Sequence, residues 1–216
     1  MKPDYQAISS RLFAAYPVLK CALHFRNPYE LLVASRLSAQ CTDKRVNIVC
    51  EDLFARWPDA PSLARADLAE VENVVRPCGL FRMKARDIVA MAAVLEKEGI
   101  PETLEGFLAL PGVGRKIANL LMGELYDAPG SVVADTHCIR LSNRLGFVTD
   151  TKDPVKVEFA LRKVVPPEEC MKFCHALVHH GRECCMARNP NCEGCFLKDL
   201  CKEYQQKEDG SWNISK

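Results

Sequence analysis

The stretch Leu110-Pro111-Gly112-Val113-Gly114-Arg115-Lys116 joins two apolar segments, residues 104–110 and 117–125, whose apolar positions have helical spacing. A proline and two glycines interrupt that pattern, and glycine adopts backbone angles closed to other residues. The stretch, called the glycine hairpin below, therefore predicts a helix, a tight turn and a second helix. Amide groups at the start of the second helix carry partial positive charge and can bind a phosphate. For an isolated Gly-x-Gly, an ordinary connection between helices is the simpler interpretation.

The residue that changes this interpretation is Lys116, in the first turn of the second predicted helix. A helix dipole disfavours an ammonium group there, and partial burial lowers a lysine pKa further. A lysine with a lowered pKa is a nucleophile at neutral pH. The hairpin therefore combines a phosphate-binding corner with a candidate catalytic amine.

A second candidate is Asp135, which follows the extended apolar pair Val132-Val133 and precedes a predicted helix over residues 136–145. An aspartate in that place is an N-cap, which is the simplest explanation of the residue taken alone. Together with Lys116 it can instead serve as the acid of a catalytic pair. The residues themselves leave both explanations open.

The whole chain has the composition of a helical globular protein. Its 216 residues are 48% apolar and 26% charged, and Gly and Pro punctuation divides it into roughly ten short helices. Apolar runs such as residues 117–122 fall far below the roughly 20 residues of a membrane-spanning helix, and Met1-Lys2-Pro3-Asp4 does not open a signal peptide. We therefore expect an intracellular protein, in which the twelve cysteines have another role than forming disulfides.

The net charge of +1 exerts no global attraction on nucleic acid, so any affinity for DNA depends on local clusters of charge. One basic stretch contains Arg76, Arg82, Lys84 and Arg86, and an acidic stretch extends over residues 59–72. A solvated helix face explains either stretch as well as a contact with a partner does. Charge alone therefore does not indicate the partner.

The glycine hairpin, followed after about twenty residues by Asp135-Thr136-His137, resembles the helix-hairpin-helix and catalytic aspartate of the endonuclease III family. Two upstream segments, Leu37-Ser38-Ala39-Gln40-Cys41-Thr42-Asp43 and Gly79-Leu80-Phe81, resemble that family's lesion-facing loops. Downstream, His180-Gly181-Arg182 resembles the start of its cluster loop. The resemblance covers nearly the whole chain, about residues 5–203.

The resemblance implies an all-α, two-lobed helix-hairpin-helix DNA glycosylase fold. One lobe would be a six-helix barrel of residues 21–132 that contains the hairpin. The other would be a cluster-containing helical lobe of residues 1–20 and 133–216. The implied partner is double-stranded DNA with damaged bases or abasic sites, and we expect a monomer without membrane association, in the cytoplasm at the nucleoid.

By the same resemblance, the activity is that of a bifunctional DNA glycosylase and AP lyase that removes oxidised pyrimidines. Lys116 would attack C1′ of the sugar, displace the base and form a Schiff base, after which β-elimination cuts the strand on the 3′ side. Asp135 would stabilise the positive charge that develops on the sugar and help to activate the lysine. Because a base inside a duplex is unreachable, the damaged nucleotide must be flipped into a pocket.

The resemblance also implies residues that contact DNA. Gln40 would fill the gap left in the base stack and Leu80 would wedge the opposite strand. Ordinary helix-surface or core positions explain both residues as well. The phosphate would be bound by the hairpin residues Gly112, Val113, Gly114 and Arg115.

Four cysteines near the C-terminus lie within 17 residues in the pattern C-x6-C-x2-C-x5-C. They are Cys185, Cys192, Cys195 and Cys201. Four thiolates suit zinc or an iron-sulfur cluster, and the spacing by itself does not separate the two. Because endonuclease III-like proteins have this spacing, the resemblance implies a 4Fe-4S cluster.

Cys184 is a departure from the usual cluster loop and offers an alternative first ligand. With either ligand, the cluster would hold residues 182–198 in a shape that presents Arg188 and backbone amides to phosphate. His175 and His179 share a helix face, and with no third ligand nearby we expect packing or polar contacts there. The other cysteines are expected to be small buried apolar residues. These are Cys21, Cys41, Cys50, Cys78, Cys138, Cys170 and Cys174.

Two other functions remain open at this stage. One is a monofunctional glycosylase for adenine or mismatched thymine, although the adenine-removing relatives lack a lysine at the place of Lys116 and usually carry an extra C-terminal domain. The other is a non-catalytic DNA-binding module that uses the hairpin and a zinc loop. That function would make the pairing of Lys116 with Asp135 a coincidence. The preference for oxidised pyrimidines rests on the resemblance alone.

Overall fold

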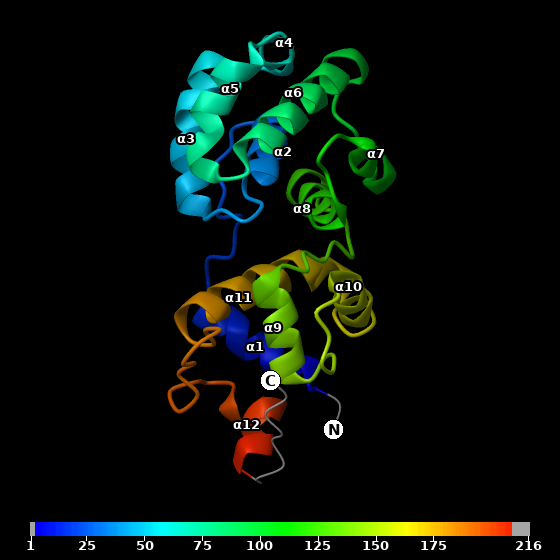
Figure 1. Ribbon diagram of the computed structural model, residues 1–216. Helices are drawn as coiled ribbons and strands as arrows, with labels where there is room; N and C mark the ends of the chain where they lie inside the picture. Colours follow the sequence, from blue (N-terminus) through cyan, green and yellow to red (C-terminus); the bar gives the residue numbers. More distant parts are fainter. Residues whose placement is uncertain (1–2, 209–216) are drawn as a thin grey trace. The chain divides into compact units, whose positions relative to one another are not determined.

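The computed structural model describes residues 3–208, and between them every regular element is a helix (Figure 1). The expected all-α fold is confirmed. The twelve α-helices of these residues exceed the roughly ten expected, because short helices such as the five-residue α4 have too few apolar positions to show a period. No helix among the described residues has the length and apolar composition needed to cross a membrane. Residues 1–2 and 209–216, the ends of the expected cluster lobe, lie outside the described residues.

The elements follow one another along the chain with short connections. In order they are α1 (Tyr5–Ala15), α2 (Pro28–Leu37), α3 (Asp43–Arg56), α4 (Ala60–Ala64), α5 (Leu68–Val75), the 3-10 helix η1 (Arg76–Cys78), α6 (Phe81–Glu98), α7 (Leu104–Ala109), α8 (Arg115–Tyr126), α9 (Thr136–Leu145), α10 (Pro154–Arg162), η2 (Pro167–Glu169), α11 (Cys170–Glu183), η3 (Lys198–Leu200) and α12 (Lys202–Glu208).

Side-chain N-caps determine where most of these helices begin. At eight helix starts an Asp, Asn or Thr side chain accepts a hydrogen bond from a backbone N–H of the first turn. The caps are Asp4, Asn27, Thr42, Asp59, Asp67, Thr103, Asp135 and Asp153. By contrast, α6, α8 and α11 begin after Leu80, Gly114 and Glu169 without a side-chain cap. The first two of these uncapped starts coincide with segments predicted to contact DNA.

The chain divides into two units, of which residues 21–127 form one. In this unit the longest helix, α6, packs against α4, α5 and α2, and α2 also contacts α3 and α8. The middle of α2 is apolar on all sides and fully covered, with Leu31 and Leu32 completely buried. α6 contributes Ile88 and Met91 to the same core. The unit thus surrounds α2 with the helices that carry the hairpin and the two predicted lesion-facing loops.

The second unit combines residues 1–20 with residues 128–216. Its centre is α11, which contacts α1 and α9, while α9 also contacts α10 and α12. Phe173 of α11 is completely buried and meets the rings of Tyr5 and Phe147 edge to face at 5.2 and 5.7 Å between ring centroids. The N-terminal helix therefore belongs to the core of the same unit as the cysteine loop.

Candidate functional site

The glycine hairpin forms the predicted helix, turn and helix, from α7 to α8. Its turn is closed by the Val113 N–H, which donates to the Leu110 carbonyl at 3.2 Å. Gly112 has φ +74°, in the left-handed region that favours glycine. Gly114 has φ −95°, which any residue adopts, so only Gly112 uses the backbone freedom that the two glycines allow. A side chain at Gly114 would meet no atom within 4 Å, so this position leaves the start of α8 open to a close approach.

Gly112 lies directly on a half-buried ion pair between α2 and α6. The Arg36 Nε donates to an Asp87 carboxylate oxygen at 2.7 Å, and the Arg36 side chain is only 7% exposed. A Cβ on Gly112 would lie 2.5 Å from Arg36 Nε and 2.8 Å from Asp87 Cβ. The absence of a side chain therefore lets the hairpin rest against two other helices, which positions it within its unit.

Lys116 lies in the first turn of α8 and its side chain is exposed. Arg115 beside it is half-buried, whereas Val113 is buried at 7% exposure. Among the predicted phosphate contacts, Val113 therefore has only its backbone to offer. Because no side chain caps α8, the start of the helix is available to an anion.

Asp135 is the N-cap of α9, which begins at Thr136 and ends at Leu145 as predicted. Its Oδ1 accepts a hydrogen bond from the Cys138 N–H at 2.7 Å, and its Oδ2 lies 3.0 Å from His137 Nδ1. The side chain is 18% exposed. Capping and catalysis do not exclude each other here, because the hydrogen bond that caps the helix also fixes the position of the carboxylate.

Gln40 and Leu80 are the two non-glycine residues of the predicted lesion-facing loops with left-handed backbones, at φ +54° and +48°. Both are exposed, and Leu80 is an apolar side chain that is 49% exposed. Such a conformation costs roughly 1–2 kcal/mol in a residue with a Cβ, so the surrounding structure must hold it. A strained backbone at an exposed side chain, which at Leu80 is also apolar, is typical of residues placed for contact with a partner.

The four predicted cluster cysteines line one cavity of the second unit, together with Cys184 and His180. Burial raises the pKa of Cys195 to about 12, so binding of a metal or cluster has to displace a proton from this thiol. The Leu197 N–H donates to Cys195 Sγ at 3.4 Å, a contact that suits a thiolate ligand. Convergence of four thiols on one cavity fits a group that takes sulfur ligands.

Cys184, the alternative ligand, is also close to this cavity. Candidate ligand atoms of His180, Cys184 and Cys195 lie within 4.8 Å of one another. However, the Cys184 Sγ donates to the Asn191 carbonyl at 3.4 Å. The Cys185 Sγ instead accepts a hydrogen bond from the Arg144 guanidinium.

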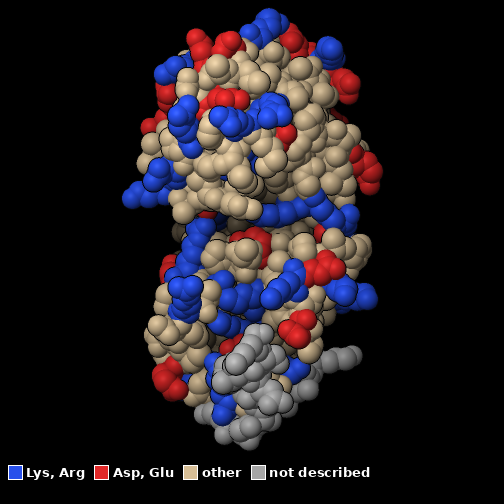
Figure 2. Space-filling view, in the orientation of Figure 1, with Lys and Arg blue, Asp and Glu red and all other residues tan. Residues whose placement is uncertain are grey.

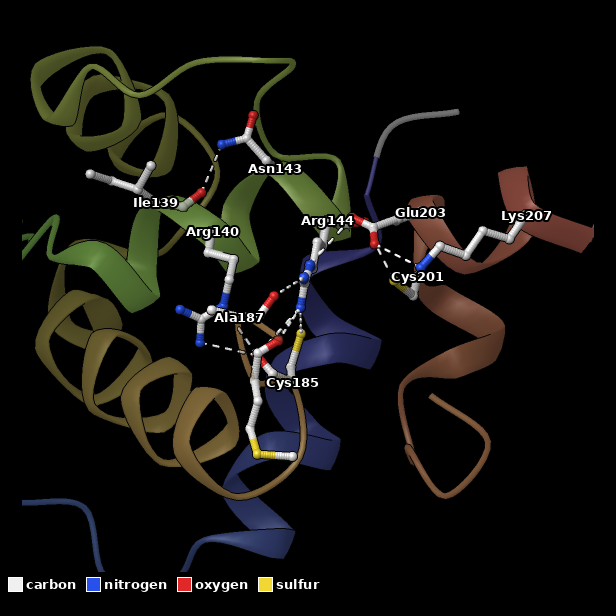
Figure 3. A network of polar contacts seen from close by, with 10 residues as sticks. Ile139, Arg140, Asn143, Arg144, Cys185, Ala187, Cys201, Glu203 and Lys207 are labelled. Atoms are coloured by element: carbon white, nitrogen blue, oxygen red, sulfur yellow. Dashed lines mark hydrogen bonds and ion pairs between the residues drawn. The ribbon is translucent and has the colours of Figure 1, made fainter. Parts of the chain in front are cut away.

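Two arginines of α9, Arg140 and Arg144, hold the start of the cysteine loop (Figure 3). Arg140 donates to the Cys185 carbonyl at 3.2 Å and to the Gly181 carbonyl at 2.9 Å. Arg144 donates to Cys185 Sγ at 3.2 Å and also pairs with Glu203 of α12 at 3.3 Å. The same helix therefore carries Asp135 at its start and contacts a predicted cluster ligand near its end. The predictions from sequence missed both arginines. Their i, i+4 spacing was a signal, because two like charges on one helix face repel each other unless other groups hold them.

Arg188 is exposed on the loop between Cys185 and Cys192, next to Asn189 with its left-handed backbone. Its guanidinium is thus in a position to reach an external anion. His179 pairs with Glu183 and stacks on Tyr16, which fits the expected polar and packing role.

Of the seven cysteines expected to be buried, five are, while Cys21 and Cys41 are half-buried. All seven are free thiols. Burial raises the pKa of Cys21 and of Cys50 to about 12, so both are neutral near pH 7. The five buried thiols behave as small core residues, as predicted, whereas Cys21 and Cys41 are only partly covered.

The face shown in Figure 2 carries clusters of Lys and Arg side chains on each of the two units. The net charge of the whole chain is only +1. Local clusters therefore exist in spite of the balanced composition, as binding of a polyanion requires.

Two parts of the chain match models of known protein families. Residues 33–167 match the HhH-GPD superfamily of base excision DNA repair proteins, and residues 185–201 match the iron-sulfur binding domain of endonuclease III. The second match begins at Cys185 and ends at Cys201, and does not include Cys184. Endonuclease III of Synechocystis sp. is 42% identical over 88% of both chains. That of Escherichia coli K12 is 36% identical over 94% of this chain and 96% of its own length.

Solved structures give the same result. A non-covalent endonuclease III–DNA complex matches 94% of this chain and 96% of its own with a TM-score of 0.89 at 36% identity. A trapped covalent endonuclease III–DNA intermediate matches 94% of this chain and 98% of its own with a TM-score of 0.88 at 37% identity. Together with the helical fold, the glycine hairpin and the cysteine loop, these similarities show that the chain belongs to the endonuclease III family.

Proposed function

We propose that the protein is a bifunctional DNA glycosylase and AP lyase of base excision repair, which removes oxidised pyrimidines from duplex DNA and cleaves the strand 3′ to the abasic site. One observation carries most of this proposal. In a chain of the endonuclease III family, an exposed lysine, Lys116, lies in the first turn of a helix whose start no side chain caps. A primary amine beside an anion-binding helix start is what covalent attack on a nucleotide sugar needs.

The proposed reaction begins when the unprotonated Lys116 amine attacks C1′ of the damaged nucleotide. A bond forms between Nζ and C1′ while the bond between C1′ and the base breaks, and the base leaves with the bonding electrons. Opening of the sugar then gives a protonated Schiff base. Loss of a proton from C2′ expels the 3′ phosphate, which cuts the strand, and hydrolysis of the Schiff base regenerates the lysine.

Asp135 is proposed to stabilise the positive charge that builds up on the sugar as the base leaves. Its carboxylate is held by the Cys138 N–H and lies 3.0 Å from His137 Nδ1, so its orientation is fixed before DNA binds. A preorganised charge of this kind contributes about 3–4 kcal/mol to transition-state stabilisation in other enzymes. The same carboxylate is a suitable acceptor for the lysine proton.

The proposed contacts with DNA divide into two kinds. Gly112, Val113, Gly114 and Arg115 bind a phosphate at the start of α8, mainly through backbone N–H groups. Gln40 and Leu80 enter the base stack, where Gln40 replaces the extruded nucleotide and Leu80 separates the opposite strand. These insertions offset the cost of unstacking, which is lowest at a damaged pair.

The cofactor is a 4Fe-4S cluster, for which we propose Cys185, Cys192, Cys195 and Cys201 as ligands. When bound, such a cluster supplies a rigid crosslink among the four thiolates and a centre able to transfer electrons. In this protein its proposed role is structural, since Arg144 and Arg140 attach the loop of the first ligand to α9.

We further propose that the protein works as a monomer on chromosomal DNA in the cytoplasm. In this proposal residues 21–132 act as the six-helix barrel with the hairpin, and residues 1–20 with 133–216 act as the cluster lobe. The two loops proposed to contact DNA and Lys116 belong to the first, and Asp135 belongs to the second.

Charge reversal at Arg188 tests the proposed role of the cysteine loop. Arg188→Glu is expected to weaken duplex binding several-fold and to reduce the slope of log affinity against log salt by about 1 or more, because a phosphate contact is lost. Fluorescence anisotropy of a labelled duplex at several salt concentrations measures both quantities. An unchanged slope with intact cluster absorbance would show that the loop does not contact DNA through Arg188.

Borohydride trapping tests the proposed function. Purified protein is incubated with a duplex that contains one thymine glycol, in the presence of sodium borohydride, which reduces a Schiff base to a stable amine. We expect a covalent protein–DNA complex and, without borohydride, base release with a nicked strand. Peptide mass spectrometry of the complex should place the modification on Lys116. Base release without a covalent complex would instead indicate a monofunctional glycosylase. If neither a covalent complex nor a nicked strand formed on this lesion or on an abasic site, that result would contradict the enzyme assignment.

A further inference from the structure

Lys84 of α6 is a buried lysine for which the reaction above has no role. Its side chain is completely covered, unlike the solvated face that explains a basic stretch most simply. Its Nζ donates one hydrogen bond to the Leu37 carbonyl and another to the Cys78 carbonyl, both at 2.8 Å. The ammonium thus joins two segments of the same unit that are remote in sequence, the end of α2 and the end of η1.

A lysine in this place is costly, so a specific reason for it is needed. Burial lowers the pKa of Lys84 below its ordinary value, and a position in the first turn of α6 opposes a positive charge through the helix dipole. Among residues 3–208 no carboxylate forms an ion pair with it, and its hydrogen-bond acceptors are two neutral carbonyls. The Leu37 carbonyl belongs to the last residue of α2, where the helix dipole is negative and favours a cation.

Leu37 is the first residue of one predicted lesion-facing segment, and Cys78 immediately precedes the other. Leu37 is followed by residues 38–42, called the Gln40 loop, in which Gln40 has φ +54°. Cys78 is followed by Gly79 and Leu80, called the Leu80 turn, with φ +69° and +48°. Each loop therefore follows a residue held by Lys84 and, within three residues, reaches a positive φ at an exposed side chain.

We propose that Lys84 is a positioning residue, which ties the Gln40 loop to the Leu80 turn so that their two exposed side chains enter the DNA stack as one unit. The inference rests on the proposed roles of Gln40 and Leu80 in base extrusion. A single ammonium serves both loops, so a displacement of one loop strains the hydrogen bond to the other. Methionine has nearly the shape of lysine but offers no donor, and it would release both loops at once.

The test compares Lys84→Met with Lys97→Met, which removes an exposed lysine from the other end of the same helix. On a thymine glycol duplex, we expect Lys84→Met to lower the single-turnover excision rate by about 10- to 100-fold, because small misplacements of positioning groups have effects of that size. On a single-stranded abasic oligonucleotide, which requires no extrusion, Schiff-base formation should stay within about twofold of wild type. Lys97→Met should match wild type on both substrates. Equal losses on the two substrates would contradict a role in extrusion.

Double variants provide a readout that general destabilisation does not produce. If Lys84 acts through the loops, Gln40→Ala and Leu80→Ala should each have a much smaller effect on duplex excision in the Lys84→Met background than in wild type. Additive effects would overturn the inference. Should Lys84→Met fail to fold, Lys84→Gln, which keeps a donor for one carbonyl, is used in the same comparisons.

Hydrogen exchange of the DNA-free protein separates this inference from the proposed function. Lys84→Met should increase amide exchange in residues 38–42 and 79–81 and leave the hairpin unchanged. If exchange in those segments did not increase, Lys84 would not connect the two loops, even if the enzyme is active. The exchange could increase in Lys84→Met although the wild-type protein forms no covalent complex and excises no base. That combination would contradict the proposed function and still support the connection between the loops.

Discussion

Replacement of Lys116 with alanine is expected to abolish strand cleavage at abasic sites, lowering the single-turnover rate by about 10⁴-fold or more, because the nucleophile itself is removed. The side chain is exposed and lies in the first turn of α8, so folding should be unaffected. Alanine is also a good helix former, so α8 should keep its length. The effect should therefore be confined to chemistry.

Lys116→Arg is the matched control for this experiment. Arginine keeps the positive charge for DNA binding, but its guanidinium remains protonated and cannot attack C1′. We expect no covalent complex with borohydride for either variant, whereas Lys116→Arg should bind an abasic duplex within a few-fold of wild type. A covalent complex in Lys116→Ala would mean that another amine of the chain is the nucleophile.

Replacement of Asp135 with asparagine is expected to lower the rate of base excision by about 10³-fold without a measurable loss of stability. Asparagine caps a helix about as well as aspartate, so the hydrogen bond to the Cys138 N–H can be kept. What is lost is the negative charge that stabilises the sugar cation, and such losses cost about 10²- to 10³-fold in rate. Single-turnover kinetics on a thymine glycol duplex, with a thermal melt beside it, measure both properties.

Asp135→Ala separates capping from catalysis. This variant loses the charge and the cap together, and loss of a cap costs about 1 kcal/mol. In a chain of this size that corresponds to a melting temperature lower by about 2–4 °C, a change that Asp135→Asn should not show. If Asp135→Asn excised the base at the wild-type rate, Asp135 would be an N-cap only and the proposed reaction would need another acid.

Local patterns in the sequence were sufficient for the fold class and for several details of the site. Cap residues, Gly and Pro punctuation and apolar periodicity act over a few residues, so the helix over Thr136–Leu145 was predicted with its correct ends. The cysteine spacing predicted a site with four thiolate ligands, and the resemblance then separated an iron-sulfur cluster from zinc. The family, the glycosylase and lyase activity and the 4Fe-4S cofactor all agree with the comparisons.

Other features depended on contacts that no local pattern reports. Both hairpin glycines were expected to use the backbone freedom that glycine allows, but Gly114 has a φ of −95°, and open space, not its backbone, distinguishes the position. Arg144 was not singled out, because Cys185 lies 41 residues further along the chain. Lys84 was counted with a basic stretch, although it is completely buried.

The sequence by itself determined the helical architecture, the hairpin with Lys116, the N-cap Asp135 and the four-cysteine loop, because each of these arises from residues close together in the chain. Only the tertiary structure decided which surfaces those elements bury. It placed Gly112 against the Arg36–Asp87 pair and the Lys84 ammonium between the Leu37 and Cys78 carbonyls. The physical reason is that packing decides whether a charged side chain is solvated or is buried with hydrogen-bond partners. For Lys84 one of those partners is 47 residues away in the sequence.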